Sequence, residues 1–193
     1  EEEYSHNARL EPGELDLNSL SLTDELANLL LSGQVTLEEA DQRLTEIDAM
    51  PSPYGKLITG CSFGLSTGAF GMLMGASWSE IFWSGLFGFV VYFWVLWSER
   101  SKRVALMLEP VIAYVVAFLA CVASRFFDPG INIPIIILSS VIIFVPGLAL
   151  TMGLAELSSR NMVSGTARIM DAMMQLFKLY FGAFLGVATG FSL

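Results

Sequence analysis

The spacing of apolar positions changes near residue 50 and divides the chain into two parts. In the first part, apolar residues recur three or four positions apart among polar ones, as they do on one face of a helix. Two short helices are predicted there, over residues 23–33 and 36–48, and Thr36 and Glu39 form a capping box at the start of the second. The proline-rich stretch at residues 51–53 ends this part, because proline cannot continue a helix.

Long apolar runs follow, and each has the length of a membrane-spanning helix, which crosses about 30 Å with about 20 residues. Backbone groups in lipid have no water to bond, so such segments must be helical. The sequence therefore predicts an all-α polytopic membrane protein. A short cytosolic helical hairpin is expected within residues 1–50, and a five-helix transmembrane domain over residues 51–193. The five spans are expected at residues 54–76, 78–97, 104–123, 131–153 and 172–191.

Charge is distributed as unevenly as hydrophobicity. Residues 1–50 contain 13 acidic and 2 basic residues, a net charge of −11, whereas residues 51–193 contain 6 acidic and 8 basic residues, a net charge of +2. Nucleic-acid binding is excluded, because no basic patch is available to neutralise phosphates. The acidic segment is expected to be the end of a longer soluble region.

The basic residues also predict the orientation of the spans. If the five spans alternate, six basic residues fall on one side of the membrane and Arg125 falls on the other. Short loops rich in Lys and Arg stay cytoplasmic, so the N-terminus is predicted inside and the C-terminus on the periplasmic or extracellular side. The six residues are Lys56, Arg100, Lys102, Arg103, Arg160 and Arg168.

A helix-breaking pair, Pro146-Gly147, lies within the fourth predicted span. Proline removes a backbone donor and clashes with the preceding turn, so the span should kink or be interrupted there. Broken helices inside membranes recur at the solute sites of transporters, where released N–H and C=O groups can hold the solute. The alternative is a simple proline kink in a packed helix, and the residues alone do not separate the two.

Charged residues surround this break. Glu156 and Arg168 follow it towards the cytoplasmic side, where ordinary loop charge is the simpler interpretation. Asp171 and Lys178 are seven residues apart and share a helix face, so we expect them to form an intramembrane ion pair that neutralises both. Glu109, followed by a proline, predicts a second kink beside an acid at the start of the third span.

Glycines recur every four residues in the first and fifth predicted spans. A row of glycines on one face of a helix, here called a glycine rib, lets helix backbones approach closely. Both spans are therefore predicted to pack against each other or against a partner. A sliding surface of a moving transporter is the functional alternative. The two ribs are Gly60, Gly64 and Gly68 in the first span and Gly182, Gly186 and Gly190 in the fifth.

At these residues the chain resembles the ThrE/YjjP family of threonine/serine exporters, specifically its N-terminal, YjjP-like half. The resemblance rests on "VPG" at residues 145–147, on Glu156 and on "SGTAR" at residues 164–168. It also rests on five spans that follow a helical segment such as "GQVTLEEADQRL". The family pattern has a longer soluble region ahead of the first span, so further sequence is expected upstream.

The resemblance implies a secondary transporter, or half of one, that exports small amino acids (threonine or serine) or small carboxylates across the bacterial inner membrane. It implies a second, five-span YjjB-like half as partner, fused or separate, and an oligomer. A second half whose chain starts on the outer side would have the opposite orientation in the membrane, so the two halves would form inverted repeats. An arginine could clamp the solute's carboxylate, and an acid could hold an ammonium group or a proton. The positions carried over as solute-binding are Pro146, Gly147, Glu156, Gly165 and Arg168.

Two other classes of function compete with the transporter. One is a non-transporting membrane scaffold or regulatory subunit that acts through its cytosolic hairpin. The other is an intramembrane enzyme, which would need a nucleophile with a base, paired acids or metal ligands at depth. His6 lies in the polar tail, and no such group of residues is visible, so the sequence predicts no enzyme, no metal site and no cofactor.

Overall fold

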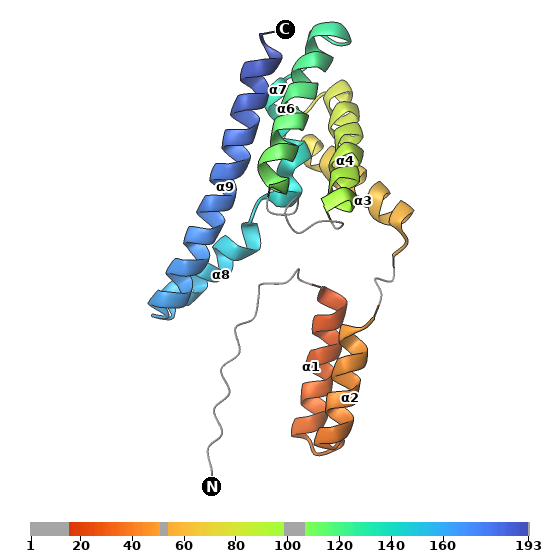
Figure 1. Ribbon diagram of the computed structural model, residues 1–193, viewed down its shortest axis with the longest axis vertical. Helices are drawn as coiled ribbons and strands as arrows, with labels where there is room; N and C mark the ends of the chain where they lie inside the picture. The colour runs from red at the N-terminus through yellow and green to blue at the C-terminus, as the bar shows by residue number, and fades with distance from the viewer. Residues whose placement is uncertain (1–15, 51–53, 99–106, 193) are drawn as a thin grey trace. The chain divides into compact units, whose positions relative to one another are not determined.

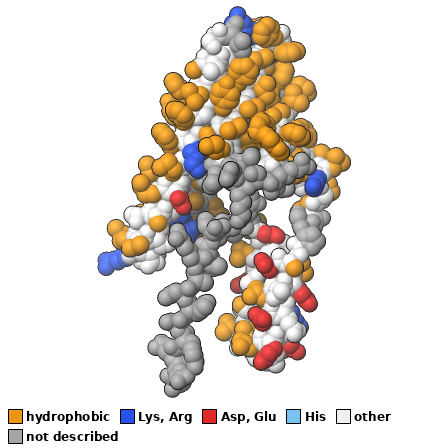
Figure 2. Space-filling view, in the orientation of Figure 1, with side chains coloured by type: hydrophobic (Ala, Val, Ile, Leu, Met, Phe, Trp, Pro, Cys, Tyr) orange, Lys and Arg blue, Asp and Glu red, His pale blue; other side chains and the backbone are white. Residues whose placement is uncertain are grey.

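The computed structural model describes residues 16–50, 54–98 and 107–192, in which every regular element is a helix (Figure 1). The chain divides after residue 53 into two compact units, which are described separately. Acidic side chains gather over the first unit, whereas hydrophobic side chains cover the visible surface of the second (Figure 2).

The first unit contains two antiparallel helices, α1 (Leu17–Leu31) and α2 (Leu37–Asp48). The capping box of Thr36 and Glu39 is confirmed at the start of α2. The predicted start of α1 at residue 23 is wrong. Asp16 caps the helix by accepting hydrogen bonds from the Asn18 N–H and a neighbouring hydroxyl, so the helix begins at residue 17.

The second unit is built around α3 (Lys56–Leu73), α4 (Trp78–Ser98), α6 (Leu108–Phe126) and α7 (Ile133–Val141). Its core forms where α4, α6 and α7 meet, and the fully buried side chains there include Val91, Ile112, Val116 and Ile136. Burial of such branched side chains stabilises a soluble core by about 1.5–3 kcal/mol each. Inside lipid, close packing replaces much of that effect.

The glycines of α3 face α4. A Cβ atom at Gly64 would lie 2.6 Å from the Phe89 ring, and the Thr67 hydroxyl donates a hydrogen bond to the Ser84 carbonyl oxygen over 2.9 Å. The first predicted rib is therefore a packing surface towards the second helix of the unit. Near the other end of the helix pair, the Tyr92 hydroxyl donates to the Lys56 carbonyl oxygen.

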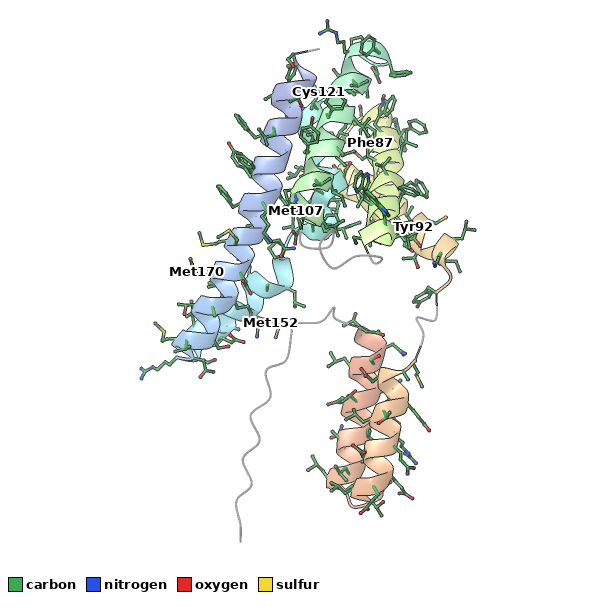
Figure 3. All side chains as sticks on the ribbon, viewed as in Figure 1. Phe87, Tyr92, Met107, Cys121, Met152 and Met170 are labelled. Carbon is green, nitrogen blue, oxygen red and sulfur yellow. The ribbon has the colours of Figure 1, made fainter. Side chains whose placement is uncertain are left out.

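The long helix α9 (Met162–Gly190) packs on α6 through the second glycine rib. Gly182 faces Pro110, Gly186 faces Tyr114 and Gly190 faces Cys121, so contacts advance in the same direction along both helices. The two helices are therefore parallel, as the third and fifth of five alternating spans must be. Cys121 lies buried at this interface, whereas Met170 near the other end of α9 is exposed (Figure 3).

A buried carboxylate joins two connections at one end of the unit. Glu80, in the first turn of α4, accepts hydrogen bonds from the backbone N–H groups of Ser77 and Asn132 over 2.6 and 2.7 Å. Ser79 donates to Asp128 alongside it. The connections α3–α4 and α6–α7 are thus held together, at the end opposite the α8–α9 connection (Figure 1).

Three helices, α4, α6 and α9, are each long and apolar enough to cross a membrane. A fourth span is obtained if α7, the 3₁₀ turn η1 (Ile142–Phe144) and α8 (Gly147–Ser158) are counted as one bent element. The 18-residue helix α3 is not among these candidates, and its sequence contains Lys56, four buried glycines and several hydroxyl residues among its apolar side chains. The predicted count of five therefore remains a prediction.

The fifth predicted span, residues 172–191, overlaps a longer helix, since α9 is continuous from residue 162. Its 29 residues rise about 43 Å, which exceeds the hydrocarbon core by about 13 Å. Glu109 and Pro110 produce no kink, because Pro110 occupies the first turn of α6, where its missing N–H needs no helical partner.

Candidate solute site

The predicted interruption of the fourth span is confirmed, and its geometry follows from proline. Val145 is extended, with φ −71° and ψ 120°, because a residue before proline is pushed out of the helical region. Pro146 adopts φ −78° and ψ 55°, and its neighbours close an inverse γ-turn in which the Gly147 N–H donates to the Val145 carbonyl oxygen. The elements on either side are bent by 63°.

The break lies in the inner half of the unit by the predicted orientation. The twelve residues of α7 and η1 that lie between Asn132 and the break rise about 20 Å. The 21 residues of α4 rise about 31 Å, so the break lies about two thirds of that length away from Asn132. Pro146 is half-buried, and Gly147 is exposed with no atom within 4 Å of a Cβ placed on it.

One carbonyl released by the break is bound by a distant helix. The Phe144 carbonyl oxygen accepts a hydrogen bond over 3.0 Å from the Gln175 side-chain amide of α9. A released carbonyl in an apolar surrounding needs such a partner. Gln175 was missed by the sequence analysis, although a lone amide among the apolar residues of a predicted span was a usable signal.

Past the break, α8 folds against the first half of α9. A Cβ at Gly153 would lie 2.8 Å from the Ile169 side chain, and a Cβ at Gly165 would lie 2.8 Å from Leu157. Gly165, predicted as a solute-binding residue, is buried and permits this close approach. Its solute role stays a prediction, whereas its packing role is visible.

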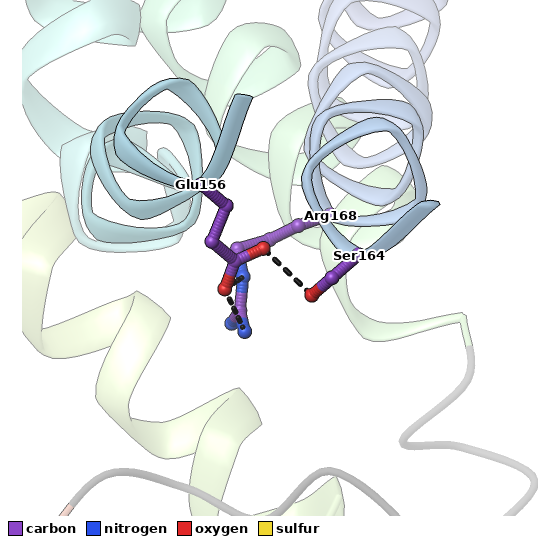
Figure 4. A network of polar contacts seen from close by, with 3 residues as sticks. All are labelled: Glu156, Ser164 and Arg168. Atoms are coloured by element: carbon purple, nitrogen blue, oxygen red, sulfur yellow. Dashed lines mark hydrogen bonds and ion pairs between the residues drawn. The ribbon is translucent and has the colours of Figure 1, made fainter. Parts of the chain in front are cut away.

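Glu156 and Arg168 meet across this contact (Figure 4). The Glu156 Oε1 atom accepts hydrogen bonds from Arg168 Nε and Nη2 over 3.2 and 2.9 Å, and Oε2 accepts one from the Ser164 hydroxyl over 2.7 Å. Both carboxylate oxygens are therefore bonded. Glu156 and Arg168 were predicted as site residues from the sequence, whereas the role of Ser164 as their partner was not.

The predicted ion pair between Asp171 and Lys178 is wrong. Seven residues of helix separate their Cα atoms by about 10.5 Å along the axis, and the acid on α6 is closer. Lys178 Nζ lies 3.5 Å from Glu109 Oε2. Asp171 is exposed and forms no ion pair with any residue that the structure describes.

The site thus consists of a broken helix and of polar groups along α9. Arg168, Gln175 and Lys178 contact α8, η1 and α6 respectively. Nothing in the described ranges groups three or more histidine, cysteine or acidic side chains around a possible metal position. The arrangement offers hydrogen-bond donors, acceptors and both charges to a small polar molecule.

We expect the Glu156–Arg168 pair to stabilise the α8–α9 contact modestly. The variants Glu156→Gln and Arg168→Gln should each lower the free energy of unfolding by about 0.5–1 kcal/mol, because the two side chains are 22% and 40% exposed. Thermal melting in detergent of both variants and of the double variant checks this. If the pair contributes nothing, the single losses will simply add in the double variant.

The fold and the site together define a helical membrane protein whose fourth hydrophobic segment is broken beside polar residues of its last helix. The family described as "Putative threonine/serine exporter" (ThrE) matches residues 1–190. The chain therefore belongs to this family, as the resemblance predicted.

Three curated relatives that match the chain are fungal proteins, two of which are named as membrane proteins. A pheromone-regulated membrane protein 10 of Yarrowia lipolytica is 27% identical over 180 residues, which cover 91% of this chain and 15% of the relative. A protein of the same name from Pichia sorbitophila is 26% identical over 95% of this chain and 19% of its own length. An uncharacterised protein of Schizosaccharomyces pombe is 23% identical over 90% and 21% respectively. No solved structure matches the chain significantly.

Proposed function

We propose that the chain is a membrane subunit, or half, of a secondary transporter for a small polar solute. The observation that carries this proposal is the broken helix, whose released Phe144 carbonyl is bound by Gln175 of another helix. Such a released backbone acceptor, which lies beside polar side chains, matches the way broken helices take part in solute sites.

The solutes proposed are threonine and serine, or small carboxylates, and the direction is export. The family description supports the amino acids. The charged residues support any solute with a carboxylate, because an arginine and a lysine both lie along α9. The proposed membrane is the inner (plasma) membrane of a bacterium. Because the curated relatives are fungal, the plasma membrane of a fungal cell is proposed as the alternative.

A second five-span half is the proposed partner, fused or separate. The chain spans about 15–21% of the length of the curated relatives that it matches, so those proteins contain much more sequence than this region. A partner that enters the membrane in the opposite direction would complete an inverted repeat around the break.

Flux measurements test the proposal directly. Proteoliposomes with the full-length protein, with and without the second half, are loaded with serine, threonine or a small dicarboxylate, and efflux is followed over time. We expect solute-specific efflux that requires both halves. Efflux no faster than from empty liposomes for the whole panel, with both halves present, would contradict the transporter.

The orientation can be tested independently. We expect reporter fusions at Ser159 to give a cytoplasmic signal, and fusions at Arg125 and at the C-terminus an external one, because basic loops stay inside. A cytoplasmic signal from the Arg125 fusion would overturn the alternating arrangement.

The scaffold remains the second candidate, and one observation favours it. The α1–α2 pair carries an apolar groove of about 600 Å³, lined by Leu26, Leu30, Leu37 and Leu44. Residues 16–50 contain eight acidic residues and one basic residue, a net charge of −7, and Glu38 and Asp41 lie at this groove. A scaffold predicts that complexes assemble through this unit and that flux through the assembled protein is absent.

A further inference from the structure

The two ion pairs of α9 differ in how completely their charges are bonded. The Glu156 carboxylate accepts three hydrogen bonds, from Arg168 and Ser164. The Glu109 carboxylate has one contact of 3.5 Å to Lys178, and none of the described residues donates a hydrogen bond to it. A carboxylate offers about four acceptor positions and an ammonium group three donors, so the described residues leave most of this pair's capacity unused.

Such a pair is costly where it lies. Glu109 Oε2 is buried from solvent, and Lys178 falls within an apolar helix 12 residues, or about 18 Å, from the end of α9. Charges in an apolar environment require excellent geometry and additional hydrogen bonds to offset their desolvation. The Glu156–Arg168 pair meets that requirement and the Glu109–Lys178 pair does not.

The surrounding packing holds the incomplete pair in place and next to the break. A Cβ at Gly182, one turn after Lys178, would lie 2.2 Å from the Pro110 carbonyl oxygen, so the α9 and α6 backbones are in contact there. Gln175, one turn before Lys178, holds the Phe144 carbonyl of the break. Apart from the buried Oε2 atom, the pair remains accessible, since the side chains of Lys178 and Glu109 are 40% and 20% exposed.

We propose that Glu109 and Lys178 form the binding site for the charged ends of a small zwitterion, an amino acid. The solute's ammonium group donates to Glu109 and its carboxylate accepts from Lys178, which completes the bonding of both side chains without any net change of charge. The Glu156–Arg168 pair, whose carboxylate oxygens are both hydrogen-bonded, fastens α8 to α9. This inference rests on the proposed transport function for its biological role but concerns equilibrium binding.

A zwitterionic solute is inferred because a negatively charged and a positively charged side chain lie together at this site. A dicarboxylate would satisfy Lys178 and be repelled by Glu109, and a simple amine would satisfy Glu109 and be repelled by Lys178. We therefore expect threonine or serine to bind, and succinate and ethanolamine to bind at least about tenfold more weakly.

The test is equilibrium binding of radiolabelled threonine to the full-length protein in detergent, with unlabelled serine, succinate and ethanolamine as competitors. Glu109→Gln and Lys178→Met should each weaken threonine binding at least about tenfold, because each removes a charge-assisted hydrogen bond. Asp171→Asn, an exposed acid on the same helix, is the matched control and should change affinity less than about twofold.

A purely structural pair must be distinguished from a binding pair. The exchanged variant Glu109→Lys with Lys178→Glu restores opposite charges, so it should melt at the wild-type temperature even if the single variants unfold. Its threonine affinity should still be at least about tenfold weaker, because the positions of the solute's two ends are reversed. Wild-type affinity in the folded exchanged variant would overturn the proposal.

Other results also decide between the two ideas. Absence of amino-acid binding by the wild type, or unchanged affinity in both single variants, would overturn the binding site. Flux measured on the same preparation tests transport separately. Threonine binding that depends on both residues, without any flux, would support the site while contradicting the transporter.

Discussion

Leucine in place of Gly186 is expected to separate α9 from α6 and to prevent stable folding of the second unit. A Cβ at this position would lie 2.4 Å from the Tyr114 carbonyl oxygen and 2.7 Å from Ala117. The first of these atoms is backbone, so no side-chain rotation relieves the clash, and a leucine adds three further carbons. Overpacking of this kind costs about 1–3 kcal/mol in ordinary cores and more where backbones touch.

The measurement is the yield of monodisperse protein in mild detergent and its melting temperature. Ala188→Leu is the matched control, because residue 188 is exposed on the same helix and the added volume is similar. We expect the Gly186 variant to aggregate and the control to behave like the wild type. A well-folded Gly186→Leu protein would show that the close α6–α9 approach is dispensable.

The double variant Pro146→Ala, Gly147→Ala is expected to lose flux while it still inserts into the membrane. Alanine favours helix by about 3 kcal/mol over proline and about 1 kcal/mol over glycine. Removing proline also frees Val145 to become helical, so α7 and α8 can join and the 63° bend is lost. A straight helix withdraws the Phe144 carbonyl from Gln175.

Gly147→Ala alone is the control for this experiment. No atom lies within 4 Å of a Cβ at Gly147, and the residue is already helical, so this change should leave folding and the 63° bend intact and shows whether the glycine itself contributes to flux. Size-exclusion profiles establish assembly, and efflux is measured on the same preparation. Normal flux from a well-assembled double variant would show that the break is only a packing kink and that transport does not require it.

Local rules in the sequence were sufficient where a few neighbouring residues determine the structure. The capping box of Thr36 and Glu39 and the break before Pro146 depend on backbone chemistry within four residues, and both were predicted. The glycine ribs were recognised as packing surfaces, but they were expected to pack against each other or a partner, whereas they lie against α4 and α6. Whether a rib faces α4, α6 or another chain depends on the arrangement of all the helices.

The polar partners could not be predicted for the same reason. Asp171 and Lys178 share a helix face, which made them the obvious pair in a single segment. Glu109 lies 69 residues earlier, and only the parallel packing of α6 and α9 brings it to Lys178. Gln175 likewise gained its role from a carbonyl 31 residues away.

Because α9 is long and uninterrupted, a small tilt near one end of the helix would produce a larger displacement at its other end. The helix is fixed to α6 by its last glycines, whereas Gly165, 17 residues before Gly182, holds α8. That distance is about 26 Å along the axis, so a tilt of about 10° around Gly182 would move the α8 attachment by about 4–5 Å. A tilt around Gly182, one turn from Lys178, would therefore be amplified at the opposite end of the helix, where α8 is attached.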